Sequence, residues 1–336
     1  MDKLITFDDV LIEPSFSTVS SRKEVNTVSC LNDEKTKLQL PIVAANMDTV
    51  CGPEMAETLI STGAMGCLHR FCTIEENVIN FLKVKKHTNK APWVSIGISD
   101  LEKQRLESLI DVGAEIVTID VAHAAQMQVV NFYKYVKLKF PHVFLIVGNF
   151  GNKNSVEKFC NHLGYKPDAI KVGIGPGSAC TTRIKTGCGV PQISALISCN
   201  QTNIPMIADG GIRTSGDVAK ALAAGARMVM LGGMIAGTKE TPGNISIIEG
   251  KAYKIYRGSA SKESYVDQGK DWSCAEGELF KTPYKGSVVE IIKDIDGGIR
   301  SALTYVGAVD LRQFREKAIF NLISNSSIKE NYAHGK

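Results

Sequence analysis

Eight short apolar runs recur between residues 41 and 233, most of them rich in β-branched residues and ending in small or polar ones. Because the apolar residues follow one another instead of alternating with polar ones, the pattern predicts parallel strands that are buried on both faces. The runs are PIVAANM (41–47), MGCLHR (65–70), VSIGIS (94–99), IVTIDVAH (116–123), VFLIVGN (143–149), AIKVGIG (169–175), PMIADGG (205–211) and RMVMLGG (227–233).

Amphipathic stretches with helical spacing alternate with these runs. The last of them opens with TSGD, where Thr214 or Ser215 can cap the helix and Asp217 lies in its first turn. Eight strand–helix units in succession favour an α/β fold of the (β/α)8 (TIM) barrel type over a doubly wound sheet, which usually has fewer units. Catalytic residues of such barrels lie in the loops that follow the strands. The predicted helices cover residues 75–86, 99–113, 128–140 and 214–226.

The pattern changes after the eighth run. Residues 244–258 alternate well enough to predict a β-hairpin that turns at Glu249-Gly250. Residues 259–285 are polar, and a long segment inserted at the catalytic face of a barrel is more often a lid than a linker, so we expect a mobile flap here. Helices are expected to resume at 286–302 and 309–323.

The bulk composition fits a single barrel domain over residues 1–336, since 44% of the residues are hydrophobic and 22% are charged. A net charge of +4 is small and evenly spread, which argues against a nucleic-acid partner. The cysteines show no CxxC pair and no zinc spacing, and no apolar stretch approaches the ~20 residues that cross a bilayer. We therefore expect a cytoplasmic protein without a membrane partner, whose few local basic residues meet an anionic small molecule.

The loop after the sixth run, GIGPGSACTTR (173–183), holds the clearest chemistry. Its glycine spacing differs from the GxGxxG fingerprint, so we interpret it as an irregular loop whose inward-turned carbonyls suit a monovalent cation. Cys180 lies where barrel nucleophiles are found, and Arg183 and Lys185 could favour its reactive thiolate; the alternative is a loop cysteine without a role. Thr182 could pass a proton or merely bind the backbone.

Two glycine pairs close the last two runs, in DGG (209–211) and LGG (231–233). Barrels often bind phosphate at these positions through backbone amides, although a Gly-Gly pair can simply make a tight turn. Asp209 could accept hydrogen bonds from ribose hydroxyls, and Asp120 could face an amide ring or cap the next helix. Glu276 lies in the predicted flap and could reach the active site only if the flap folds back.

Together, these stretches resemble the IMP dehydrogenase/GMP reductase family along nearly the whole chain. The resemblance implies a TIM barrel that binds a purine nucleotide and a nicotinamide cofactor. The matching stretches are ANMDTV (45–50), GIGPGSACTTR (173–183) leading to GVPQ (189–192), IADGGIRTSGD (207–217), MLGGM (230–234), YRGSAS (256–261), PYKG (283–286) and GGIRSALTYVG (297–307).

Within the family, the chain resembles the reductases more than the dehydrogenases. Dehydrogenases usually carry a paired regulatory module after the second strand, but only residues 71–93 lie between the second and third runs here. Their flap also carries an Arg-Tyr pair that activates water, and residues 259–285 contain no such pair. Two alternatives stay open: a dehydrogenase that has lost its regulatory module, and a purine-nucleotide sensor without turnover. Retention of Cys180, Thr182 and Glu276 together argues against the sensor.

The resemblance implies an enzyme that reductively deaminates GMP with NADPH, giving IMP, ammonia and NADP⁺. Cys180 would attack the purine C2, ammonia would leave, and a hydride would then resolve the covalent thioimidate. The leaving nitrogen must first be protonated, and the resemblance implies Thr182 and Glu276 for this relay. It also implies a K⁺-type monovalent cation and a homotetramer in which neighbouring subunits share the cofactor site.

Matching positions imply where each ligand binds. The implied substrate-binding residues are Asp209, Gly210, Gly211, Gly232, Gly233, Gly258, Ser259, Ser273 and Gly277. The implied cofactor-binding residues are Ser21, Arg22, Arg70, Asp120, Val121, Ala122, Ile174, Ser301 and Thr304, and the implied cation-binding residues are Gly175, Gly177, Cys180 and Arg183. Ser273 and Ser259 stand where many reductases carry arginine and methionine, which leaves affinity and cofactor preference open.

Overall fold

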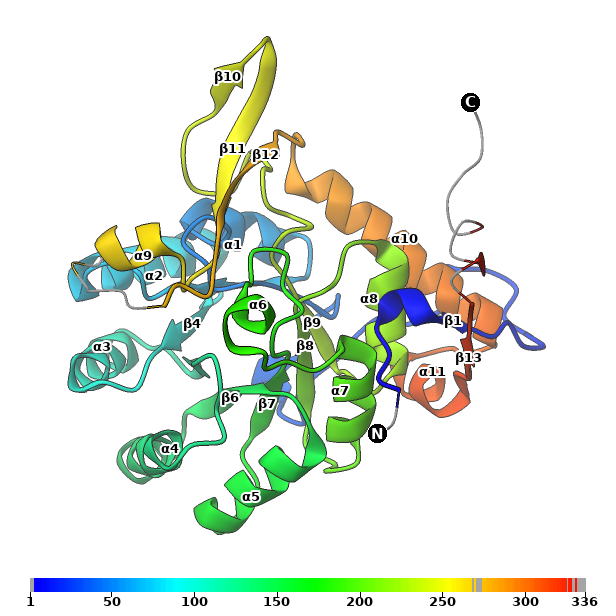
Figure 1. Ribbon diagram of the computed structural model, residues 1–336, viewed down its shortest axis with the longest axis horizontal. Helices are drawn as coiled ribbons and strands as arrows, with labels where there is room; N and C mark the ends of the chain where they lie inside the picture. Colours follow the sequence, from blue (N-terminus) through cyan, green and yellow to red (C-terminus); the bar gives the residue numbers. More distant parts are fainter. Residues whose placement is uncertain (1–2, 268, 270–273, 325, 328–329, 331–336) are drawn as a thin grey trace.

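The computed structural model describes residues 3–267, 269, 274–324, 326–327 and 330 (Figure 1). Eight parallel strands form a closed barrel in sequence order, and the last strand pairs with the first. Each strand overlaps one of the eight predicted runs, so the TIM-barrel prediction is confirmed. The strands are β2 (Ile42–Ala44), β3 (Met65–Leu68), β4 (Trp93–Ile96), β5 (Ile116–Asp120), β6 (Phe144–Phe150), β7 (Ala169–Val172), β8 (Met206–Asp209) and β9 (Met228–Leu231).

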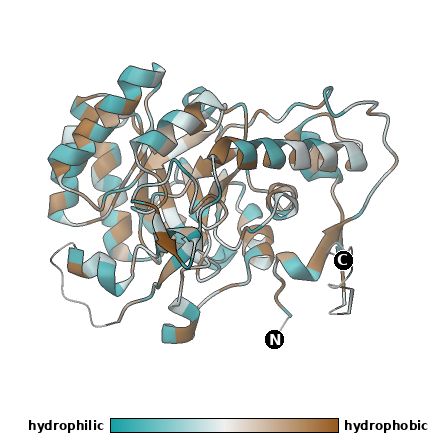
Figure 2. Ribbon diagram, turned by 90° about the horizontal axis from the view of Figure 1, so that it is seen from above, coloured by the Kyte–Doolittle hydropathy of each residue, from teal (hydrophilic) through white to brown (hydrophobic). Residues whose placement is uncertain are grey.

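Helices follow the strands, and apart from the short α6 (Thr182–Thr186), which lies over the middle of the barrel in Figure 1, they cover its outside. Most carry both polar and apolar stretches, as Figure 2 shows, because one face packs on the strands and the other faces water. Thr214 caps α8 as predicted: its Oγ1 accepts the Asp217 amide, and the Asp217 carboxylate accepts the Thr214 amide. The helices are α1 (Pro53–Ser61), α2 (Ile74–Thr88), α3 (Asp100–Asp111), α4 (Met127–Lys139), α5 (Lys153–Leu163), α6 (Thr182–Thr186), α7 (Gln192–Asn200), α8 (Ser215–Ala223) and α10 (Val288–Val306).

The predicted hairpin is present as β10 (Ser246–Ile248) and β11 (Lys251–Arg257), and it projects beyond the outer helices, at the top of Figure 1. Glu249 and Gly250 at its turn both have positive φ, as tight hairpin turns require. The segment 259–285 contains two elements that the sequence pattern did not show. They are α9 (Lys262–Asp267) and β12 (Leu279–Pro283), which adds a third antiparallel strand to the hairpin.

The prediction of a helix over 309–323 is wrong at its C-terminal end. The helix α11 (Leu311–Lys317) stops where Ala318 turns extended, and β13 (Phe320–Leu322) then pairs antiparallel with β1 (Val10–Ile12). Because the partner strand lies near the other terminus of the chain, the local pattern carried no sign of this pairing. Two short 3₁₀ turns, η1 (Phe7–Asp9) and η2 (Glu34–Thr36), complete the N-terminal segment.

Between β3 and β4, where every residue is described, the chain forms α2. Within the described part of the chain, the longest helices are too short or too polar to span a bilayer.

Candidate active site

The loops after the barrel strands enclose a cavity of about 1220 Å³. The segment that follows β11 also lines it, with Glu276 among its contributions. The cavity therefore lies at the carboxyl ends of the strands, where the fold places catalytic groups. Of the predicted site residues, those that line it are Arg70, Asp120, Val121, Ala122, Ile174, Gly175, Gly177, Cys180, Thr182, Arg183, Asp209, Gly210, Gly211, Gly232, Gly233, Gly258, Ser259 and Glu276.

The cysteine-bearing loop between β7 and α6 packs closely against the end of β8. Gly173 adopts a φ of +154°, and a Cβ there would lie 1.8 Å from the Asp209 carbonyl oxygen, so only glycine fits. Further along the loop, the Cys180 thiol lies 3.1 Å from Thr182 Oγ1. The Thr182 hydroxyl in turn donates to Glu276 Oε2 at 2.6 Å. A sulfur, a hydroxyl and a carboxylate thus form one chain of hydrogen bonds.

The flap folds back onto this loop, which is what brings Glu276 into reach. The Thr181 amide donates to the Glu276 carbonyl at 2.8 Å, and the Glu278 amide donates to the Ala179 carbonyl at 3.0 Å. Gly277 lies between them, opposite Cys180 on one side and Ser261 on the other. A Cβ on Gly277 would approach the Ser261 nitrogen to 2.9 Å, so glycine allows the segments to meet. Backbone pairing therefore fixes the Glu276 side chain beside Thr182.

The predicted phosphate end of the cavity is formed by Gly232 and Gly233 after β9. A Cβ on Gly233 would lie 2.6 Å from Ser178 Oγ, and one on Gly232 would lie 3.2 Å from the Tyr256 hydroxyl. The Ser178 hydroxyl also lies 3.3 Å from that of Tyr256. These two hydroxyls were not predicted, because one comes from the cysteine loop and the other from β11, and no local motif marks them. Backbone amides and hydroxyls grouped in this way suit a phosphate.

A charged group that the sequence interpretation missed forms the floor of the cavity. The ammonium of Lys171 lies 2.8 Å from Asp120 Oδ1 and 2.5 Å from Asp209 Oδ2. Asn46 donates to the second oxygen of Asp120 at 2.9 Å, and Asn149 donates to Asp209 Oδ2 at 2.9 Å. The sequence did contain a sign of this group: Lys171 lies inside the apolar run AIKVGIG, and a lysine in a buried strand is almost always paired.

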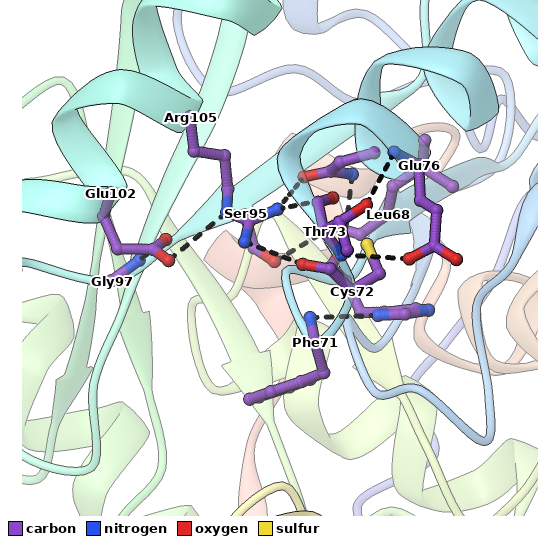
Figure 3. Close-up of polar contacts among 11 residues, drawn as sticks. Leu68, Phe71, Cys72, Thr73, Glu76, Ser95, Gly97, Glu102 and Arg105 are labelled. Atoms are coloured by element: carbon purple, nitrogen blue, oxygen red, sulfur yellow. Dashed lines mark hydrogen bonds and ion pairs between the residues drawn. The ribbon is translucent and has the colours of Figure 1, made fainter. Parts of the chain in front are cut away.

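The loop between β3 and α2, which carries Arg70, is held by a buried ion pair (Figure 3). Arg105 donates to the Cys72 carbonyl at 2.8 Å and to the Thr73 carbonyl at 3.3 Å, and it pairs with Glu102 at 3.2 Å. Glu102 also accepts the Gly97 amide at 2.7 Å. This cluster fixes the position from which Arg70 reaches the cavity.

Arg70 itself has spare hydrogen-bonding capacity. Its guanidinium lies over the Phe71 ring at 4.9 Å from the ring centroid, and its buried Nε has no hydrogen-bond partner among the described residues. Val121 and Ala122 line the cavity beside Asp120. Because Arg70 lines the cavity, its positive charge suits an anionic ligand at this end.

The loop also offers backbone oxygens of the kind that hold a monovalent cation. Gly175 has a φ of +83°, and a Cβ there would clash with the Arg183 side chain at 2.7 Å. Among the described residues, the carbonyls of Gly175 and Cys180 accept no backbone hydrogen bond, whereas that of Gly177 accepts the Cys180 amide. Arg183 donates to the Val190 carbonyl at 2.8 Å. The donor set therefore fits a hard, weakly charged cation.

Some predicted residues lie elsewhere. Ser21, Arg22, Ser301 and Thr304 do not line the main cavity; Arg22 and Ser301 line a separate hollow of about 520 Å³ beside α10. Ser273 lies outside the described residues.

The fold and the site define a class of protein: a TIM barrel with a loop cysteine linked to a hydroxyl and a carboxylate, next to a phosphate-type end. Comparison with known proteins then gives the family. The model of the family "IMP dehydrogenase / GMP reductase domain" matches residues 4–334. The chain therefore belongs to the IMP dehydrogenase/GMP reductase family, as the sequence motifs indicated.

Curated relatives of similar length are named GMP reductase. That of Buchnera aphidicola subsp. Schizaphis graminum is 37% identical, over 96% of this chain and 95% of the relative. That of Vibrio vulnificus is 36% identical, over 98% of this chain and 97% of the relative. A solved structure of a cysteine-to-alanine variant of GMP reductase from Trypanosoma brucei, in complex with guanosine 5′-monophosphate, superposes with a TM-score of 0.90. It is 26% identical and covers 100% of this chain and 98% of that one.

Proposed function

We propose that this protein catalyses the reductive deamination of GMP to IMP and ammonia, with NADPH as the reductant. GMP, NADPH and two protons give IMP, NADP⁺ and ammonium. The observation that carries the proposal is the hydrogen-bonded chain from Cys180 through Thr182 to Glu276, set in a cavity with a phosphate-type end. The relatives named GMP reductase and the neighbour bound to GMP support the same substrate.

The chain of three side chains supports covalent catalysis at the purine C2. As Cys180 Sγ attacks C2, its proton passes through the Thr182 hydroxyl to Glu276, which is 2.6 Å from that hydroxyl. Glu276 then returns a proton along the same path to the departing amino nitrogen, which leaves as ammonia. The substrate remains bound to Cys180 as a thioimidate. After reduction of C2, the C2–Sγ bond breaks and releases IMP and the Cys180 thiolate, which takes a proton from solvent.

The nicotinamide cofactor, when bound, supplies the hydride that reduces C2. We assign Arg70, Asp120, Val121, Ala122 and Ile174 to its site, because they line the cavity and Arg70 adds a positive charge there. Arg70 is also suited to the 2′-phosphate that distinguishes NADPH from NADH.

Ser21, Arg22, Ser301 and Thr304 would then serve the cofactor bound to a neighbouring subunit, since they lie outside this chain's own cavity. A homotetramer with shared cofactor sites is the arrangement that we propose. The nine cysteines, all free thiols, support the cytoplasm as its compartment.

The substrate would lie with its phosphate at Gly232, Gly233 and Ser178 and its ribose hydroxyls at Asp209. Gly210, Gly211, Gly258, Ser259 and Gly277 would complete the nucleotide site, together with Ser273 of the flap. A monovalent cation such as K⁺ would bind the carbonyls of Gly175, Gly177 and Cys180, with Arg183 beside it.

Absorbance at 340 nm separates this proposal from the alternatives. Purified protein with GMP and NADPH in potassium buffer is compared with the same protein given IMP and NAD⁺. GMP-dependent loss of NADPH supports the reductase. Appearance of NADH from IMP would instead identify a dehydrogenase without a regulatory module. Neither reaction, with GMP still bound, would identify a nucleotide sensor.

A further inference from the structure

A buried lysine to which we have assigned no role in the proposed reaction lies at the centre of the cavity floor. Lys171 belongs to β7, and its side chain is only 3% exposed. One ammonium group contacts two carboxylates, Asp120 from β5 and Asp209 from β8. Gly148 on β6 makes room for it, because a Cβ there would lie 2.4 Å from Lys171 Cβ. The three charges form one packed unit that spans four neighbouring strands.

The charges in this unit depend on one another. Burial by itself would lower the pKa of Lys171, but Asp120 and Asp209 outweigh burial and raise it. Burial would likewise raise the pKa of Asp120, but Lys171 and Arg70 outweigh it and the pKa is lowered. Asp120 therefore stays ionised beside the ammonium, and the same ammonium also contacts the Asp209 carboxylate. Without the ammonium, two partly buried carboxylates would face each other unscreened.

The contacts within the unit also leave different oxygens of Asp120 and Asp209 available to ligands. Lys171 and Asn149 occupy Asp209 Oδ2, while Asp209 Oδ1 accepts no hydrogen bond from the described residues. Asp120 has both oxygens engaged, one by Lys171 and one by Asn46. Asp209 can thus accept a hydroxyl through one free, oriented oxygen, whereas Asp120 presents a fixed charge.

We propose that Lys171 is a positioning residue that serves the nucleotide site and the nicotinamide site at once, by orienting Asp209 toward the ribose hydroxyls and holding Asp120 beside the cofactor. The assignment of the two sites rests on the proposed function. The contacts of Lys171 with Asp120 and Asp209 do not depend on it, so they can be tested separately from the reaction.

Replacing Lys171 by methionine keeps the volume of the side chain and removes the ammonium. Two carboxylates that had shared one ammonium then face each other across the methionine without a cation, so their repulsion raises the pKa of one of them and favours its protonation. The other titratable groups that face the unit are Arg70, Cys67 on β3 and Tyr256 on β11, with Cys180 next to Tyr256. Only Arg70 is cationic, and it lies on the Asp120 side.

The variants Lys171→Met and Lys171→Met/Asp120→Asn are compared with the unaltered protein, with GMP binding measured by calorimetry without cofactor from pH 6 to 8.5. Lys254→Met is the matched control, because Lys254 is also buried but its ammonium contacts the Thr238, Lys239 and Thr241 carbonyls instead of a carboxylate. Melting temperatures over the same pH range require no ligand. Initial rates with GMP and NADPH complete the set.

For Lys171→Met we expect GMP affinity to fall by at least about 30-fold at pH 8.5 and to recover in part toward pH 6. The variant should also lose stability as pH rises through the raised pKa, since its protonated carboxyl is favoured only in the folded state. Lys171→Met/Asp120→Asn should bind GMP within about fivefold of the unaltered protein while turnover stays low, because the cofactor side has lost its carboxylate. Lys254→Met should leave GMP affinity and its pH dependence unchanged.

GMP binding by Lys171→Met that equals that of the unaltered protein would overturn the proposal. So would a double variant that is no better than the single one, or that fails to fold. If Lys171→Met does not fold, a folded double variant that binds GMP supports the proposal. Absence of GMP reduction by the unaltered protein would refute the proposed function alone. The melting temperatures of Lys171→Met and of the unaltered protein across pH would still show whether Lys171 holds the two carboxylates.

Discussion

Glutamate 276 offers the most direct perturbation of the proposed proton relay. Glu276→Gln keeps the size of the side chain and an oxygen that can accept the Thr182 hydroxyl, now 2.6 Å away, but it cannot take or return a proton. General acid–base catalysis typically contributes about 10²- to 10⁴-fold. At 1.36 kcal/mol per tenfold change in rate, this corresponds to about 3–5 kcal/mol of transition-state stabilisation.

The substitution should act on turnover and leave binding nearly intact. The flap is held by the backbone of residue 276, through the Ala260 carbonyl and the Thr181 amide, and glutamine preserves both contacts. We therefore expect kcat to fall at least about 100-fold while the Kd for GMP changes less than about threefold. Rates are measured from NADPH absorbance, and Kd is measured by calorimetry without cofactor.

Glu278→Gln is the matched control, because Glu278 is exposed, lies two residues further along the same segment and does not line the cavity. Its kcat should match that of the unaltered protein. A Glu276→Gln enzyme with kcat within about fivefold of the unaltered protein would refute the relay. A loss of GMP affinity equal to the loss of kcat would assign Glu276 to the structure of the flap instead.

Three further predictions concern the rest of the cavity. Gly233→Val should raise the KM for GMP at least about tenfold in NADPH assays, because its Cβ would lie 2.6 Å from Ser178 Oγ. Gly216→Ala is the control and should leave the KM unchanged, because its Cβ would lie 3.6 Å from Thr214 Oγ1 and near nothing else. Arg105→Met should cost about 3–5 kcal/mol in denaturant unfolding, because it leaves Glu102 buried without its cation. It should also raise the KM for NADPH, because it loosens the loop that carries Arg70. Lys103→Met removes a cation whose partner, Asp100, is exposed, and it should change neither quantity. Replacing K⁺ by Li⁺ should lower kcat at least about tenfold, because the carbonyls of the cysteine loop, at their fixed spacing, cannot hold a smaller cation. Equal rates in both salts would show that no K⁺-type cation is needed for turnover.

The barrel could be predicted from the sequence because each of its strands is buried on both faces and therefore leaves a continuous apolar run. The cysteine loop and the glycine pairs were visible for a related reason, since they follow those runs directly. The pairing of β13 with β1 and of β12 with β11 was not visible, because each depends on a partner far along the chain.

The side chains that support the site were the harder part to predict. Lys171 could have been noticed as a lysine within an apolar strand, but its two carboxylate partners are set by the closure of the barrel. Glu276 was named as a candidate only on condition that the flap folds back, and the backbone pairing with Ala179 and Thr181 meets that condition. Ser178 and Tyr256 left no local signal, because their hydroxyls meet only in the folded chain.

The central claim is that Cys180 bonds to the purine C2, and mass spectrometry of the trapped enzyme tests it most directly. The protein is incubated with IMP and NADP⁺ without ammonia, quenched in acid and digested. Because the flap lacks an Arg-Tyr pair to activate water, the thioimidate should accumulate. The peptide that contains Cys180 should then gain the mass of IMP less two hydrogens, and Cys180→Ala should show no adduct. An unmodified Cys180 peptide together with full turnover of GMP, or an adduct on another residue, would contradict the account.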